Sequence, residues 1–155
     1  MAAPVCLRLV QTLVVMNTYR RYKRLRRSVP FLIACWAQNQ AVFERDEQRY
    51  EEDSWAFGEF SDIARNYPEK CWNCILYALG DLRCHPFLGD LAAGPLEDLL
   101  SHHGELVTER VEYIALSSPL FARTLGGVWR SGITEPVWQR VQSAAIPLGN
   151  VANDA

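Results

Sequence analysis

The chain has 155 residues, of which 49% are hydrophobic and 22% charged, and this composition is typical of a soluble globular domain and argues against a disordered protein. Its formal net charge of −2 hides an asymmetry, because residues 1–30 carry seven Lys or Arg and no Asp or Glu, whereas residues 31–155 carry nine against eighteen. The acidic part repels phosphates, so we expect no nucleic-acid binding by the folded domain.

Residues 1–30 are predicted to be a basic, poorly ordered extension. The apolar run 5–16 contains Arg8 and is shorter than the roughly 20 residues that a membrane-spanning helix needs. A signal peptide carries its positive charges before its apolar run, but here they follow it, as Arg20, Arg21, Lys23, Arg24, Arg26 and Arg27. We therefore predict neither secretion nor a membrane span. Two alternatives stay open: an arm that binds an anionic membrane or RNA, and a true translation start at Met16.

From position 28 onward the pattern is helical. Ser28 is predicted to cap a helix over residues 29–42, and the charged run 44–53 is interpreted as a solvated helix end and a loop. Apolar residues at three- and four-residue intervals predict a second helix over 55–67. Pro68 should end it and begin a third, whose apolar stripe is Trp72, Ile75, Leu76, Leu79 and Leu82.

The stretch with the strongest local signals is residues 91–104. Gly94 is predicted to end one short helix with a positive φ angle, Pro95 to begin the next, and Gly104 to close that helix in turn. The chain should therefore fold back on itself at Gly94-Pro95. Four leucines are expected to fill the angle between the two helices: Leu91, Leu96, Leu99 and Leu100.

Three more helices complete the predicted elements. They span residues 105–116, with Leu106 expected on the buried side, 119–125, and a last segment capped by Thr134; residues 146–155 should fray. No window alternates with period two for long enough to be a strand, and the connections are short. We therefore expect an all-α array of antiparallel helical hairpins in a single domain of residues 31–145, for which a HEAT-like solenoid is one possible form.

Several of these segments resemble a known family. Pro68-Glu69-Lys70-Cys71-Trp72, the Gly-Pro-Leu-Glu-Asp-Leu-Leu segment of 94–100, His103-Gly104, and Leu-Gly-Gly-Val-Trp at 125–129 occur together with Val137-Trp138. In this order they are similar to an uncharacterised family of small bacterial helical domains, a domain of unknown function. The resemblance covers about residues 53–145, and it implies a bacterial, cytoplasmic protein without implying an activity.

Cysteine usage leads to the same compartment. Five cysteines form an odd set without the density of a disulfide scaffold, so a reducing environment is predicted. Cys71 and Cys74 form a Cys-x-x-Cys pair upstream of Cys84-His85, and a zinc site is the alternative interpretation. Because the pair lies three residues apart within a helical pattern, we interpret it as packing at the edge of the core and predict no metal and no cofactor.

Four polar residues are the candidates for chemistry: Glu97, Asp98, His102 and His103. Asp98 and His102 are four residues apart on one helix face, which allows a metal pair or an acid–base couple. The structural interpretation is preferred, because acidic residues stabilise the first turn of a helix and histidines the last. Glu97, three residues after Gly94, also has the position of a capping-box acid. A small enzyme that uses these four residues remains the alternative function.

Trp129-Arg130, which follows a double glycine, is the interaction candidate. An aromatic residue beside an arginine is a frequent anchor of protein interfaces, although we expect Trp129 to be buried, since Trp is usually largely buried. The predicted function is a non-catalytic acidic helical module that binds another protein, for instance a basic one. The pattern predicts no oligomeric state.

Overall fold

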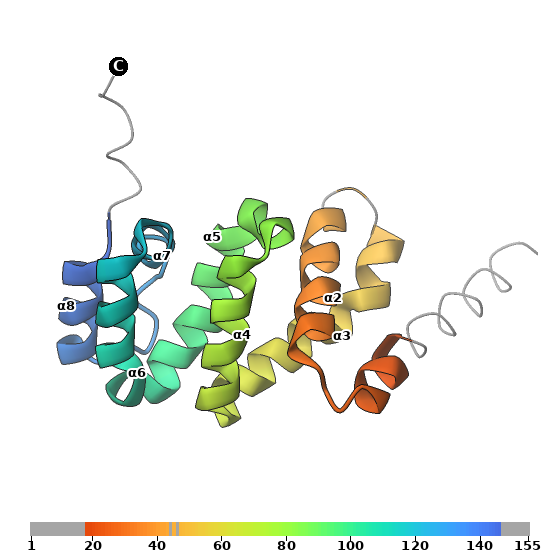
Figure 1. Ribbon diagram of the computed structural model, residues 1–155, viewed down its shortest axis with the longest axis horizontal. Coiled ribbons are helices and arrows are strands. Elements are labelled where there is room, and N and C mark those ends of the chain that lie inside the picture. Colours follow the sequence, from red (N-terminus) through yellow and green to blue (C-terminus); the bar gives the residue numbers. More distant parts are fainter. Residues whose placement is uncertain (1–17, 44, 46, 147–155) are drawn as a thin grey trace, which may run out of the picture. The chain divides into compact units, whose positions relative to one another are not determined.

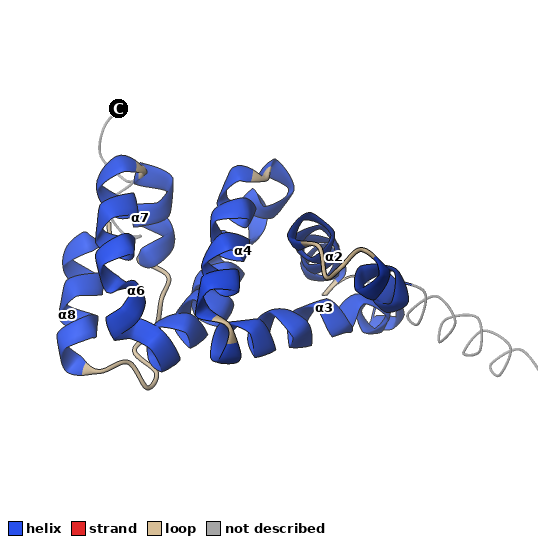
Figure 2. Ribbon diagram, turned by 60° about the horizontal axis from the view of Figure 1, so that its bottom comes forward, coloured by secondary structure: helices blue, strands red, loops and turns tan. Residues whose placement is uncertain are grey.

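The computed structural model describes residues 18–43, 45 and 47–146, and the side chains of 47–53 are excluded from that description. Helices dominate this part of the chain, and no strand occurs in it, which confirms the predicted all-α class (Figures 1 and 2). Apart from residues 18–24, which are also helical, the elements are α2 (Val29–Val42), α3 (Glu47–Asn66), α4 (Pro68–Gly80), η1 (Leu82–Phe87), α5 (Leu88–Leu91), η2 (Ala92–Leu96), α6 (Glu97–Ser117), α7 (Pro119–Leu125) and α8 (Glu135–Ala144).

The chain divides into two compact units, Met1–Phe60 and Ser61–Ala155. The division falls within α3, so the single domain of residues 31–145 stays a prediction. The apolar run 5–16 and nearly all of the expected tail, residues 147–155, lie outside the described residues. Among the helices that are described, none combines the length with the apolar character that a membrane span requires.

Aromatic residues hold the first unit together. The Trp36 and Phe60 rings meet edge to face at 5.9 Å, and the rings of Tyr22 and Trp55 lie 5.1 Å apart. The helical residues 18–24 thereby pack on α3, where the Tyr22 hydroxyl also donates a hydrogen bond of 3.1 Å to Glu59. Ser28 caps α2 as predicted, since its Oγ accepts a hydrogen bond from the backbone N–H of residue 31.

The predicted loop at 44–53 is wrong over most of its length, because α3 already begins at Glu47. The segment contains Glu, Gln and Arg and has no Gly or Pro before Gly58. These residues are good helix formers, so the charged run extends the helix, and Asp53-Ser54 lies inside it.

The predicted joint at Gly94-Pro95 is also wrong. Gly94 has no positive φ, and the chain stays helical from α5 through η2 into α6. A proline inside an α-helix removes a hydrogen bond and clashes with the carbonyl four residues earlier. Here Pro95 lies in η2, a single π-type turn, whose wider hydrogen-bond spacing accommodates the ring without a break.

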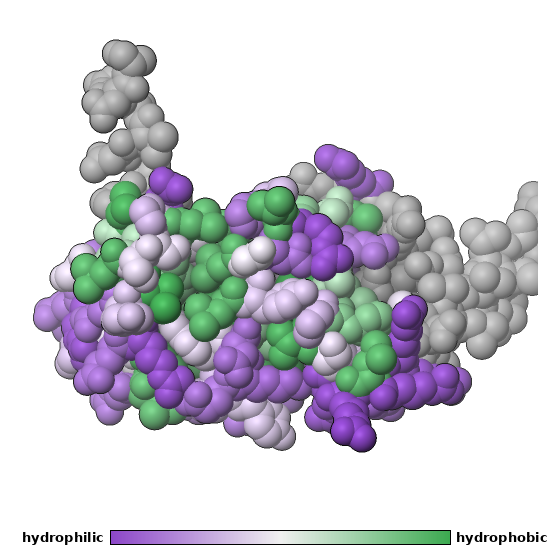
Figure 3. Space-filling view, in the orientation of Figure 1, coloured by the Kyte–Doolittle hydropathy of each residue, from purple (hydrophilic) through white to green (hydrophobic). Residues whose placement is uncertain are grey.

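The core of the second unit centres on α6, against which both α7 and α8 pack (Figures 1 and 2). The four predicted leucines at 91, 96, 99 and 100 are all buried, and the Trp72 ring meets Phe121 edge to face at 6.0 Å. Leu82 and Leu106, both expected in the core, are exposed. Over the part of the view occupied by α4, α6 and α7, Figure 3 shows apolar residues interspersed among polar ones.

Candidate functional site

Helix α6 carries all four polar candidates, and it bends at His103. The backbone of His103 is non-helical, with φ −136° and ψ 23°, although hydrogen bonding continues to Ser117. The predicted end of a helix at Gly104 is therefore a kink. A Cβ on Gly104 would lie 2.8 Å from Val137 Cγ1, so the glycine lets α8 approach the kink closely.

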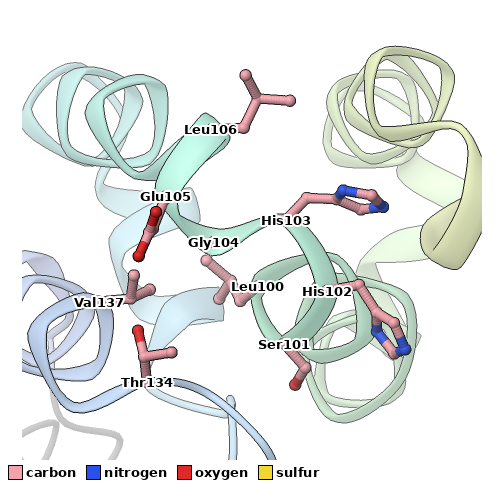
Figure 4. Close-up of a pocket in the computed structure, with 9 residues that line it drawn as sticks. All are labelled: Leu100, Ser101, His102, His103, Gly104, Glu105, Leu106, Thr134 and Val137. Carbon is pink, nitrogen blue, oxygen red and sulfur yellow. The ribbon is translucent and has the colours of Figure 1, made fainter.

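A hollow of about 370 Å³ lies at this kink (Figure 4). In Figure 4 the His102 and His103 rings extend from α6 on the side away from Val137 and Thr134. The residues that line the hollow are Leu100, Ser101, His102, His103, Gly104, Glu105, Leu106, Thr134 and Val137.

The two histidines contact backbone carbonyls. His103 Nε2 lies 2.8 Å from the carbonyl oxygen of Arg65, in the last turn of α3. His102 Nδ1 lies 2.8 Å from the backbone carbonyl of Asp98 and not from its carboxylate. Because a carbonyl only accepts, each ring donates an N–H there. The Asp98/His102 spacing thus produces a contact within the helix and no side-chain couple.

The two acidic candidates also have structural partners. Asp98 Oδ2 accepts a hydrogen bond of 2.8 Å from the Ser61 hydroxyl, and Arg65 Nη2 lies 3.7 Å away. Glu97 Oε2 accepts a hydrogen bond of 3.3 Å from the backbone N–H of Trp129. Glu97 therefore holds the loop after α7, whereas Asp98 holds the last turn of α3. Asp98 and His103 thus share Arg65 as a neighbour, whereas Glu97 contacts Trp129 and His102 contacts its own helix.

The loop between α7 and α8 presents Trp129 to solvent. Val128 and Ile133 are buried at either end of its exposed part, whereas Trp129 is 73% exposed. The expectation that Trp129 is buried is therefore wrong: the buried neighbours anchor the loop, and the hydrogen bond to Glu97 fixes the backbone at position 129. Arg130, the other interaction candidate, forms an ion pair with Glu135 at the start of α8.

The structure also shows an exposed surface on α6 that we did not predict from the sequence. Tyr113 is 72% and Leu116 89% exposed, and Tyr113 lines a hollow of about 310 Å³ with Trp72, Glu109, Arg110 and Ile114. The available signal was periodicity: Val107 and Val111 are four residues apart on the buried face, and Tyr113 is out of phase with them.

The cysteines of the second unit are core residues. Cys71, Cys74 and Cys84 are buried; burial raises the pKa of Cys71 far above its ordinary value and that of Cys84 to about 11. A thiol that stays protonated at neutral pH is a poor nucleophile and a poor metal ligand. Within the described residues, no three or more His, Cys, Asp or Glu side chains form a group that could hold a metal ion.

Comparison with known proteins places these features in a family. No curated protein and no solved structure matches the chain. One family model, described as a family of unknown function (DUF6869), matches residues 43–147. The matched range contains every helix from α3 to α8 and covers more than half of the chain. The resemblance to an uncharacterised domain of unknown function is thus confirmed, and the chain belongs to the DUF6869 family.

Proposed function

We propose that this protein is a non-catalytic module that binds another protein, with Trp129 as the main contact residue. The observation that carries the proposal is the exposure of this indole on an anchored loop. Fully burying a large apolar side chain contributes about 1.5–3 kcal/mol, and Trp and Arg are enriched among the residues that dominate binding energy at interfaces. Position 129 forgoes that stabilisation in the isolated chain and would regain it in a complex.

The loop is held in place before any partner arrives. Besides the contact between Trp129 N–H and Glu97, the Ser101 hydroxyl donates to the carbonyl of Ser131, and the Val128 N–H donates to Leu125 at 3.1 Å. Gly132 has a φ of +71°, a conformation that glycine adopts readily. A preorganised loop loses less conformational entropy on binding than a flexible one.

The charges around the loop favour a basic partner. Glu97 accepts a hydrogen bond from the backbone N–H of Trp129, and the next residue, Arg130, pairs with Glu135. Residues 61–155 carry eleven Asp or Glu and seven Lys or Arg. Complementary charge at the rim of an interface speeds association and selects partners. The partner that fits is a protein with an apolar pocket for the indole and basic residues around it.

The compartment belongs to the same proposal. Four cysteines, Cys35, Cys71, Cys74 and Cys84, are buried, and no disulfide joins any two of them, which suits a reducing environment. We infer a cytoplasmic location, and a bacterial origin rests on the family resemblance alone.

The test compares two equally exposed aromatic residues. The experiment captures three tagged full-length proteins from lysate of the native host: the parent, the Trp129→Ala variant and the Tyr113→Ala variant. Native mass spectrometry then measures the proteins bound to each. We expect a stoichiometric basic partner with the parent and Tyr113→Ala, and its loss with Trp129→Ala at unchanged circular dichroism. A photo-crosslinking residue at position 129 should then form a covalent adduct with that partner. Retention by Trp129→Ala, or a lone chain carrying a small ligand, would refute the proposal.

A further inference from the structure

The most concentrated positive charge in the described chain lies in residues 20–27, here called the basic turn. Six of its eight residues are cationic, and all six are exposed: Arg20, Arg21, Lys23, Arg24, Arg26 and Arg27. Within the described part of the chain, none of these side chains forms an ion pair with a carboxylate. Two instead lie over aromatic rings, Arg21 at 5.4 Å from the Phe31 centroid and Lys23 at 4.7 Å from that of Tyr19.

Packing against α3 directs the charges outward. Tyr22 is fully buried and donates to Glu59, and the Thr18 hydroxyl accepts a hydrogen bond of 3.1 Å from Trp55 Nε1. With about 3.6 residues per helical turn, Arg20 and Arg24 lie on the side of the helix opposite Tyr22. The uncharged face thus joins α3, and the cationic face meets solvent.

Main-chain hydrogen bonds fix the C-terminal end of the basic turn. The N–H of Arg27 donates to the carbonyl of Tyr22 at 3.0 Å, and that of Arg26 to Lys23 at 3.2 Å. Both arginines adopt positive φ angles, 53° and 56°, which non-glycine residues rarely do. Ser28 caps α2 immediately afterwards. The two arginines are therefore held by main-chain hydrogen bonds in a turn between two helices.

The neighbouring apolar residues distinguish a lipid surface from a nucleic acid. Proteins that bind single-stranded nucleic acid stack bases on free aromatic faces, but here Tyr19, Tyr22 and Trp55 pack on one another at 5.1–6.4 Å. Leu25, by contrast, is 45% exposed within the basic turn. By sequence, the apolar run 5–16 comes shortly before it. Cations together with apolar residues are the combination that binds an anionic bilayer at its interface.

We propose that the basic turn, residues 20–27, is a docking surface for an anionic phospholipid bilayer. Its exposed cations bind the headgroups and Leu25 enters the headgroup region, without any part of the described chain crossing the membrane. This site lies in the first unit and is independent of the proposed contact at Trp129. Each Lys or Arg near such a surface is expected to raise affinity roughly fivefold, and salt weakens the attraction.

The experiment measures co-sedimentation of the full-length protein with phosphatidylcholine vesicles, with and without phosphatidylserine. The key variant is Arg26→Asn/Arg27→Asn, because Asn tolerates positive φ while removing two charges. Arg26→Lys/Arg27→Lys keeps the charges, and Arg83→Asn/Arg123→Asn removes two exposed cations from the second unit. Single-stranded RNA serves as a competitor, and circular dichroism confirms that each variant is folded.

We expect binding only to phosphatidylserine vesicles, weakened by added salt. The Asn variant should bind at least tenfold more weakly, whereas the Lys variant and the second-unit variant should bind like the parent. Three results would each overturn the proposal. The Asn variant could bind as well as the parent, the parent could fail to bind phosphatidylserine vesicles, or RNA at equal phosphate concentration could displace the protein from the vesicles. Displacement by RNA would identify a nucleic-acid surface instead.

Discussion

His103 Nε2 lies 2.8 Å from the carbonyl oxygen of Arg65 and so joins the kink in α6 to the last turn of α3. The last carbonyls of a helix have no partner within it, and the imidazole supplies one of them with a donor. This contact gives a residue that the sequence offered as a catalytic candidate a structural role.

His103→Ala is expected to lower the free energy of unfolding by about 1 kcal/mol, the usual net value of a hydrogen bond of this kind. Urea denaturation followed by circular dichroism measures the change. His102→Ala is the matched control: His102 is exposed and bonds within its own helix, so its loss should cost less. Equal effects of the two substitutions would show that the contact with Arg65 contributes nothing.

Gly104→Ala should destabilise the protein, because the new Cβ would lie 2.8 Å from Val137 Cγ1. Overpacking of a close-packed site costs about 1–3 kcal/mol, and we expect a loss of that size. Val is stiff at χ1 and cannot turn its methyl groups away freely. In a double-mutant cycle, the cost of Gly104→Ala should shrink in the Val137→Ala background. An unchanged cost in that background would place the strain elsewhere than at Val137.

Gly58→Ala should have the opposite effect and stabilise the protein. Gly58 lies in the middle of α3 on an exposed face, and nothing lies within 4 Å of a Cβ built there. Ala is favoured over Gly in a helix interior by about 0.5–1 kcal/mol, so the midpoint of thermal unfolding should rise. A fall would mean that position 58 contacts part of the chain outside the described residues.

The Arg110–Glu69 pair should make stability depend on pH. The two bonds between the guanidinium and the carboxylate measure 2.8 and 2.9 Å, and hydrogen bonding to Arg110 lowers the pKa of Glu69 from its ordinary value of 4.5. Because the pKa of Glu69 is lower in the folded state than in the unfolded state, the pair stabilises the fold at pH values above the unfolded-state pKa. This contribution is lost as the pH falls through the folded-state pKa.

The Arg110→Gln variant should therefore unfold at a lower urea concentration than the parent at neutral pH. This gap between the two urea midpoints should close in acid, at pH values below the ordinary pKa of Glu. Because both groups are exposed, the gap should be small and should also close in high salt. A gap that persists unchanged in acid would trace the effect to lost packing of the Arg110 side chain instead.

Local signals predicted many helix ends correctly. Ser28 caps α2 by accepting a hydrogen bond from the N–H three residues later, and the prolines at 68, 119 and 136 all lie in the first turn of a helix. Such helix starts depend on a few adjacent residues. The prediction of the all-α class also needed only local signals, namely helical periodicity and short connections. The family membership likewise followed from short segments in order.

Tertiary packing decided what these signals could not. Trp129 is exposed because Val128 and Ile133 are buried on either side of it and Glu97 holds its N–H; none of this is visible from the hydrophobicity of Trp. Gly104 serves the close approach of Val137 instead of ending a helix. Helix periodicity and capping are properties of neighbours in the chain, so the sequence alone determined them. Side-chain partners distant in the chain depend on how the helices pack, and that was decided only in three dimensions.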